Sequence, residues 1–374
     1  MSVLHRVLLT ACWLLAAGCA QKVADERIWV GHVAPLSGAE KALGEHERQG
    51  ILLAVEEANH GDRRILGRRV AVQHVDDRGA PDAAQAEAVR LIAVNRVFGL
   101  LGGTAPPEAE RLARTAQANA VPAVLLGPLP ASVGREGVAS LTASPTRQGQ
   151  VLGRFVRQKL ESTRAGAIVS GRSSVYTDLS AAFRREFSRE GAEEWVYEAE
   201  GDFPDLLKRL KKAAPEALLI AAPARDFLRL TALVREAELK TALLYGGPEG
   251  ELPLLLADRA TAEGVYAATT YLAEADTAVN REFVKNYQDH FHEPPDVAAA
   301  LAYDGARLLF QALRQMRFLD PAKARRELTL IDKFESLTGP VTFGKDPHAV
   351  RPLFVAQVEK GRLKQAERYE PDGK

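Results

Sequence analysis

The chain has 374 residues, of which 46% are hydrophobic and 26% charged, and its 49 lysines and arginines are matched by 49 aspartates and glutamates. These values fit a globular protein of two or three domains, each able to bury a core. A formal net charge of zero excludes a general electrostatic attraction to nucleic acid or anionic lipid, because both depend on clustered cations. We therefore expect no nucleic-acid partner.

Cysteine and histidine usage argues against a metal site. The two cysteines, Cys12 and Cys19, both lie near the N-terminus, so the rest of the chain has no thiol pair and no cysteine ligand. His290 and His292 are two residues apart, and on a helix such residues point away from each other. We expect neither a metal nor a cofactor.

The N-terminus has the features of a secretory signal. Arg6 is followed by an apolar run over residues 7–17. At about 1.5 Å per residue this run covers roughly half of a ~30 Å hydrocarbon core. Residues 1–18 are therefore expected to be a signal peptide and not a membrane span.

The signal ends in Leu15-Ala16-Ala17-Gly18-Cys19, which resembles a bacterial lipobox. In such a motif Cys19 would be acylated and become the new N-terminus, and two or three acyl chains would anchor the protein stably. Residues 19–27 would form a polar tether. We expect a lipid-anchored protein of the cell envelope that faces the periplasm or the exterior and touches the membrane through its anchor alone. The alternative is an ordinary secretory peptide cut near Ala20.

Residues 28–145 alternate short β-rich runs with amphipathic helices. Strands are expected at 28–34, 70–75, 97–101 and 121–126, and helices at 45–60, 81–95 and 107–119. This alternation predicts a parallel sheet that is covered by helices on both faces.

The same alternation restarts after Ser144-Pro145. Helices are expected at 148–160, 177–190, 203–213 and 226–238, and strands at 165–170, 194–197, 217–222 and 242–245. Residues 280–317 are then almost wholly helical, and residues 341–366 are β-rich. Two successive units of about 120 residues predict an α/β protein with two doubly wound parallel-sheet lobes.

The chain is expected to cross between the lobes several times, through a hinge. The helical block would return to the first lobe, which would comprise residues 28–145 and about 273–333. The terminal strands would return to the second lobe, which would comprise residues 146–272 and about 334–370. The crossings are expected near Ala143, Leu272 and Lys333.

A series of different short motifs is spread along nearly the whole mature chain. They are IWVGHVAPLSG at 28–38, GILLAVEEAN at 50–59, LGR at 66–68, Asp76-Asp77, FPDLLKRLK at 203–211, AEGV at 262–265, EPPD at 293–296, ALAYD at 300–304 and LTGPVTFG at 337–344. In this order the sequence resembles the branched-chain amino acid (Leu/Ile/Val) type of periplasmic binding protein, which has the type I fold. The resemblance implies a hinged, two-lobed receptor that closes on a small ligand without transforming it.

The expected fold also predicts where such a ligand would lie. In open α/β sheets, ligands bind beyond the carboxyl ends of the strands. The loops at these ends are 36–44, 102–106 and 127–132 in the first lobe, and 171–177, 222–226 and 246–251 in the second.

The resemblance further implies which residues would hold the ligand. Amino-acid-binding members hold the ligand carboxylate with backbone N–H groups and hydroxyls of the first lobe, and the ammonium with an acidic residue. By position, Tyr176 corresponds to a cleft tyrosine, and Glu249, in GPEG at 247–250, to the ammonium partner. The first-lobe candidates are Leu43, Thr104, Ala105 and Ser132.

The first-lobe loops depart from the family pattern. Segments 103–107 (GTAPP) and 127–132 (GPLPAS) contain prolines where loops rich in serine and threonine are expected. Proline has no N–H to donate. The ligand would therefore be less zwitterionic than an α-amino acid, or the pocket would be vestigial.

Each candidate also has a purely structural explanation. Tyr176 could pack within its own lobe, and Glu249 could be solvated in a Gly/Pro turn. Thr104 and Ser132 could simply cap the helices that follow them.

The favoured function is a receptor that binds a small molecule, such as an amino acid, an amide or a related compound, and delivers it to an ABC permease. The alternative is an envelope lipoprotein that uses the same fold to regulate a protein partner. An enzyme is not expected, because the sequence has no Gly-x-Ser-x-Gly elbow or other catalytic constellation, and a fold alone confers no chemistry.

Overall fold

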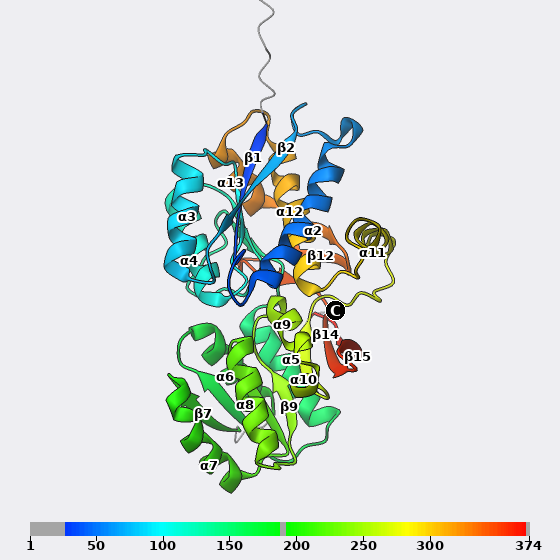
Figure 1. The fold of residues 1–374 in the computed structure, drawn as a ribbon. Helices are drawn as coiled ribbons and strands as arrows, with labels where there is room; N and C mark the ends of the chain where they lie inside the picture. Colours follow the sequence, from blue (N-terminus) through cyan, green and yellow to red (C-terminus); the bar gives the residue numbers. More distant parts are fainter. Residues whose placement is uncertain (1–26, 188–191, 372–374) are drawn as a thin grey trace, which may run out of the picture.

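Two lobes stacked end to end make up residues 27–187 and 192–371, which a computed structural model describes (Figure 1). The first lobe is built on a five-stranded parallel sheet of order β2-β1-β3-β4-β5. Its strands are β1 (Ile28–Ala34), β2 (Val70–Asp76), β3 (Leu100–Gly102), β4 (Ala123–Leu125) and β5 (Val138–Ser140).

Helices from two stretches of the chain cover this sheet. They are α2 (Lys41–Asn59), α3 (Pro81–Ala93) and α4 (Pro106–Ala118), then α11 (Ala278–Phe291), α12 (Val297–Gln315) and α13 (Pro321–Leu330). Helices α2 and α12 pack so closely that a Cβ on Gly50 would fall 2.1 Å from the carbonyl oxygen of Ala299. This contact positions α2, whose N-terminal end reaches the junction of the lobes (Figure 1).

The second lobe is built on a seven-stranded sheet of order β15-β14-β10-β9-β8-β6-β7. Its parallel strands are β6 (Ala165–Ser170), β7 (Glu193–Tyr197), β8 (Ala217–Ala221), β9 (Ala242–Tyr245) and β10 (Tyr266–Thr269). An antiparallel edge is added by β14 (Leu353–Glu359) and β15 (Arg362–Tyr369). The helices of this lobe are α5 (Pro145–Gln158), α6 (Ser174–Phe187), α7 (Phe203–Ala213), α8 (Ala224–Glu236), α9 (Leu252–Ala257) and α10 (Arg259–Ala262).

A small antiparallel sheet is formed by β11 (Lys333–Ser336), β12 (Gly339–Phe343) and β13 (Ala349–Val350). The sequence assigned residues from about 334 onward to the second lobe. In the structure this sheet instead adjoins β5 of the first lobe, where the Ser140 N–H donates to the Pro347 carbonyl at 2.8 Å. Helix α12 also holds it there, because Arg307 donates to the Glu335 carbonyl at 3.0 Å and the Leu337 N–H donates to Asp304 at 2.9 Å.

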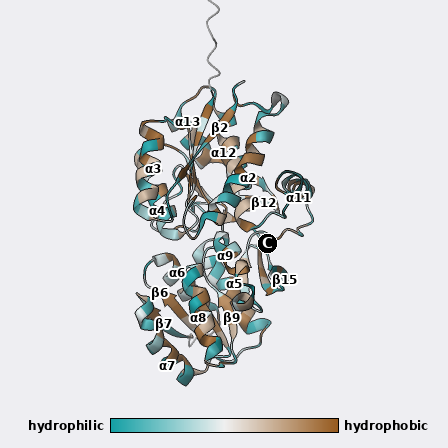
Figure 2. Ribbon diagram, in the orientation of Figure 1, coloured by the Kyte–Doolittle hydropathy of each residue, from teal (hydrophilic) through white to brown (hydrophobic). Residues whose placement is uncertain are grey.

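The central strands of both lobes are buried on both faces. Every residue of β3, β4, β5, β6 and β8 is buried. In Figure 2 the strands of the second lobe are largely brown, whereas the outer faces of the surrounding helices carry teal. Continuous apolar strands of this kind are typical of parallel sheets covered on both sides. The predicted fold class, α/β with two parallel-sheet lobes, is confirmed.

The described chain passes between the lobes at 141–144, at 270–277 and at 351–352. The last passage takes the place of the crossing expected near Lys333, because residues 333–350 stay with the first lobe. Arg351, only 5% exposed, joins all three passages. Its guanidinium donates to the carbonyl oxygens of Leu141 and Thr270, each at 3.3 Å, and also to the hydroxyls of Ser336 and Thr338.

The predicted signal peptide and lipid anchor belong to the N-terminal segment of the chain. The signal peptide over 1–18 and the acylated Cys19 lie outside the described residues. Within residues 27–187 and 192–371, no helix combines the length and the apolar character needed to cross a membrane.

Candidate functional site

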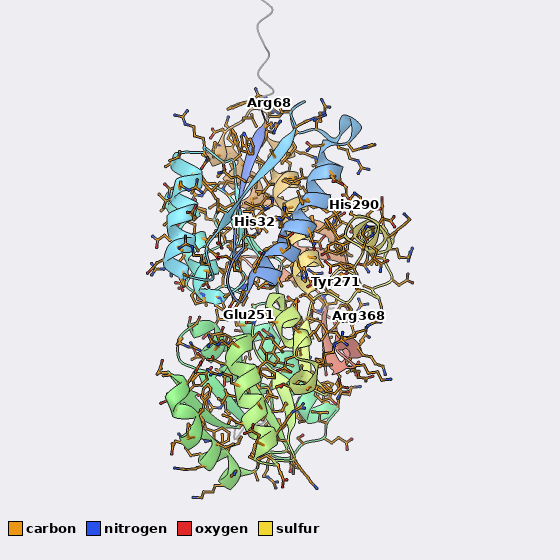
Figure 3. All side chains as sticks on the ribbon, viewed as in Figure 1. His32, Arg68, Glu251, Tyr271, His290 and Arg368 are labelled. Carbon is orange, nitrogen blue, oxygen red and sulfur yellow. The ribbon has the colours of Figure 1, made fainter. Side chains whose placement is uncertain are left out.

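The carboxyl ends of the strands of both lobes meet at the lobe junction, where Figure 3 labels Glu251. One close contact there is between Thr104, after β3, and Gly250 in the 3₁₀ turn η4 (Glu249–Glu251), after β9. A Cβ on Gly250 would lie 2.6 Å from Thr104 Cγ2, closer than side chains pack. Glycine at this position therefore lets the two lobes touch.

Of the first-lobe candidates, Thr104 makes this contact and Ala105 follows it in the chain. Leu43 is buried in the first turn of α2, Thr104 is buried after β3, and Ala105 is the N-cap residue of α4. Ser132 is exposed, and its hydroxyl accepts a hydrogen bond at 3.0 Å from Arg114, a partly exposed side chain of α4. The structure therefore does not bring Ser132 together with the other candidates.

Glu47, on α2, is a buried carboxyl that the sequence analysis did not single out. It accepts a hydrogen bond from the Thr104 hydroxyl, and its other oxygen lies 3.2 Å from His32 Nε2. Burial raises the pKa of Glu47 to about 8 and lowers the pKa of His32 to about 3, which keeps the imidazole neutral. The signal that could have found Glu47 is its position on the apolar stripe of α2, between Leu43 and Ile51.

In the second lobe, Tyr176 lies in the first turn of α6 and is buried in the core of its lobe. Burial, with the nearby charge of Glu251, raises the pKa of Tyr176 well above its ordinary value, so the phenol stays neutral. Tyr176 therefore packs within its own lobe, and its role toward a ligand stays a prediction.

Glu249 is buried and strongly hydrogen-bonded, which excludes the solvated turn. Its Oε2 accepts from the Thr270 N–H at 2.5 Å, the Thr270 hydroxyl at 2.9 Å and the Thr269 hydroxyl at 3.0 Å. All three of these bonds end on the same carboxylate oxygen. The protein therefore fixes this carboxyl through Oε2, from the turn after β9 to the last residue of β10 and the residue that follows it.

Further carboxyls surround the contact. Glu251 Oε2 accepts from the Ala224 N–H at 2.7 Å and from the Tyr245 hydroxyl at 3.2 Å, and burial raises its pKa to about 8. Burial likewise raises the pKa values of Asp77 and Glu108 to about 7 each. Within the described ranges, no group of three or more His, Cys, Asp or Glu side chains is arranged to hold a metal ion.

Comparison with known proteins supports the resemblance inferred from the motifs. The profile of the periplasmic binding protein family matches residues 27–362. The chain is 25% identical over 355 residues to Leu/Ile/Val-binding protein homolog 7 of Brucella suis, a match that covers 88% of this chain and 86% of that protein. It is 21% identical over 345 residues to the leucine-, isoleucine-, valine-, threonine- and alanine-binding protein of Pseudomonas aeruginosa, with 90% of each chain covered.

Solved structures share the fold. A leucine-binding protein from Thermotoga maritima has a TM-score of 0.84 at 22% identity, covering 92% of this chain and 99% of its own. A solute-binding protein from R. palustris in complex with 4-hydroxybenzoate has a TM-score of 0.79 at 23% identity, covering 92% and 98%. With its two lobes, its three passages between them and a family profile that spans most of its length, the chain belongs to the periplasmic binding protein family.

Proposed function

We propose that this protein is the solute receptor of an ABC-type importer, which holds a small molecule between its lobes and presents it to the permease. The observation that carries the proposal is the setting of Glu249: it is buried, and its Oε2 is bonded to Thr270 at a passage between the lobes. The Thr270 carbonyl in turn accepts from Arg351. A ligand bound at Glu249 would therefore act directly on the segments that connect the lobes.

The ligand site comprises residues from both lobes. Glu249 accepts a hydrogen bond from the ligand, and Tyr176 forms one wall. Thr104 and Ala105, with Leu43 beneath them, form the opposite wall. The relatives bind, by their names, branched-chain amino acids or 4-hydroxybenzoate, which supports a small organic ligand.

A melting screen tests this function. A ligand present at a hundredfold excess over its Kd stabilises the folded state by about 2.7 kcal/mol, which corresponds to a shift of several degrees. The screen should include amino acids, amides, aromatic carboxylates and amines at millimolar concentration. Absence of any shift would count against solute binding and favour the alternative, a lipoprotein that regulates a protein partner.

We further propose that the mature protein is a lipoprotein anchored through Cys19. The support is the sequence from Leu15 to Cys19, followed by a tether that leads to β1 at Ile28. Replacing Cys19→Ala should move the protein from the membrane fraction to the soluble fraction, because acylation at that sulfur provides the anchor. If the variant still sediments with membranes after a carbonate wash, the anchor is elsewhere.

A further inference from the structure

Four carboxyls gather around the contact between the lobes, and we call them the cleft carboxyl cluster: Glu40, Asp77, Glu108 and Glu251. Asp77 is 1% exposed, Glu108 7% and Glu251 5%, and Glu40 is half-buried. Each follows the carboxyl end of a strand: Glu40 comes after β1, Asp77 after β2, Glu108 after β3 and Glu251 after β9.

The cluster members lie near one another across the junction. A Cβ on Gly79 would lie 3.2 Å from Glu40 Oε2, and the Gly79 N–H donates to Asp77 Oδ1 at 2.9 Å, so Glu40 and Asp77 flank the same turn. The negative charge of Glu40 raises the pKa values of Asp77 and Glu108 in its own lobe and of Glu251 in the other.

Some of these carboxyls accept hydrogen bonds, but unlike neighbouring carboxylates they are not paired with a cation among the described residues. Asp226 pairs with Arg172, and the charge of Arg351 acts on Glu249. In the described part of the chain, by contrast, no ion pair includes a member of the cluster. The nearby cation is Arg225, an exposed residue of α8 that lowers the pKa of Glu40.

Glu108 supplies an independent sign of a missing partner. Its Oε2 is buried and has no hydrogen-bond donor in the described structure. A buried acceptor without a donor is costly, and native proteins rarely keep one without a reason. Glu108 lies in the first turn of α4, and its charge acts on Glu251 across the junction while those of Asp77 and Glu40 act on it, so its carboxyl lies among the cluster members.

We propose that the ligand of this receptor is an organic cation, an amine or guanidinium compound without an α-carboxylate, whose N–H groups bind the cleft carboxyl cluster. This assignment rests on the solute-binding function proposed above and names its substrate class. An ammonium or guanidinium group would donate to the unpartnered Oε2 of Glu108 and to the carboxyl of Glu251 in charge-assisted hydrogen bonds. An aromatic or aliphatic carboxylate would instead be repelled by the cluster.

The first lobe also lacks the groups that bind a carboxylate. The Thr104 hydroxyl already donates to Glu47, and the loops 103–107 and 127–132 contain prolines, which have no N–H. A bare metal ion fits less well than an organic cation, because no three ligating side chains of the described residues are close enough together to coordinate one.

Cation binding should be coupled to proton release. Burial holds the pKa values of Asp77 and Glu108 at about 7 and that of Glu251 at about 8, so part of the cluster is protonated at neutral pH. A cation favours the ionised carboxyls, so its affinity should increase as the pH rises.

The other charged and titratable groups at the junction do not compete with this titration. His32 and His74 have pKa values of about 3, and Tyr176 and Tyr245 have pKa values well above their ordinary value, so all four stay neutral. Glu47 has a pKa of about 8 and adds to the same proton release. The arginines remain charged throughout: Arg225 beside Glu40, Arg172 on Asp226 and Arg351 beside Glu249.

The experiment is isothermal titration calorimetry on the purified protein at constant ionic strength. The probes are putrescine and agmatine as cations, and leucine and 4-hydroxybenzoate as ligands that carry a carboxylate. We expect a cation to bind, and to bind at least about tenfold more weakly to Glu108→Gln and Glu251→Gln, since each loses a charge-assisted bond. Glu282→Gln, an exposed carboxyl of α11, is the matched control and should bind like the original protein.

Proton release gives a second readout. The binding heat should depend on the ionisation enthalpy of the buffer, and the affinity should rise at least about threefold between pH 6.5 and 8.5. Melting of each ligand-free variant shows whether it is folded.

The results separate this inference from the function on which it rests. Binding of leucine or 4-hydroxybenzoate without binding of either cation would overturn the cation assignment and leave a solute receptor. Cation binding that is the same in Glu108→Gln and Glu251→Gln would overturn the role of the cluster. If none of the four probes binds, the cation assignment is wrong and solute binding itself is weakened.

Discussion

At the scale of single residues, Gly250 controls how closely the lobes approach. A methyl group at this position would lie 2.6 Å from Thr104 Cγ2, and the Thr104 side chain cannot easily turn away because its hydroxyl is bonded to Glu47. We expect Gly250→Ala to cost about 1–3 kcal/mol in the closed arrangement, as overpacking does. Small-angle scattering should therefore show a larger radius of gyration than that of the original protein.

A second substitution, at Thr104, should reverse the effect of Gly250→Ala. Thr104→Ser keeps the hydroxyl and removes the clashing methyl group, so the double variant Gly250→Ala/Thr104→Ser should return to the original radius. Gly201→Ala is the matched control, because nothing lies within 4 Å of a Cβ at that glycine. An unchanged radius in Gly250→Ala would show that the lobes do not depend on this contact.

The candidate site was only partly predictable from residues alone. Glu249 was identified by its position in GPEG, but that its Oε2 would be bonded to Thr269 and Thr270 could not be read from a turn sequence. Glu108 and Glu251 were missed because a carboxylate in the first turn of a helix, or in a Gly/Pro turn, is ordinarily solvent-exposed. Their burial depends on residues that are distant in the sequence, and no local sequence pattern encodes such burial.

At the scale of elements, Arg351 holds the three passages between the lobes in one arrangement. It is buried, and its charge also acts on Asp304 and Glu249. Replacing it, as in Arg351→Gln, leaves several buried acceptors without donors and two buried carboxyls without a cation. We expect a loss of about 3–5 kcal/mol in the free energy of unfolding, measured by urea denaturation.

An exposed arginine provides the comparison. Arg281 on α11 pairs with Asp276 at the surface, and both side chains are largely exposed. Arg281→Gln should therefore change the free energy of unfolding by less than about 1 kcal/mol. Similar losses in the two variants would mean that Arg351 contributes no more than a surface charge.

Helices and strands with a clear hydrophobic periodicity were predicted well from the sequence, whereas very short strands were not. The alternation of strands and helices over 28–145 and after 145 anticipated the parallel sheets, because buried strands and amphipathic helices carry strong patterns. The three-residue strand β5 was missed, since so short a run has no period. Residues 334–350 were assigned to the second lobe, although they adjoin β5 of the first, because alternation reports which face of a strand is buried and not which element covers it.

At the scale of the whole molecule, buried ionisable groups make stability depend on pH in two opposite ways. The folded-state pKa values of Glu47 and Glu251 are raised to about 8, and those of Asp77 and Glu108 to about 7. Their contribution to stability is full below the unfolded values and is lost as the pH rises through 7 to 8. His32 and His74, with pKa values lowered to about 3, contribute stability above 6.5 that is lost as the pH falls.

Above pH 6.5 the histidines are neutral in both states, so the carboxyls alone determine the slope. The folded protein binds more protons than the unfolded chain there, and its free energy of unfolding should fall by at least about 1 kcal/mol between pH 6.5 and 8.5. Calorimetric melting of the ligand-free protein should show this as a drop of at least about 2 °C. The double variant Glu108→Gln/Glu251→Gln should show a smaller drop, since two of the responsible groups no longer titrate. A melting temperature that stays level or rises over this range in the original protein would mean that these carboxyls are ionised at ordinary pKa values, and that the lobe junction is better hydrated than its burial indicates.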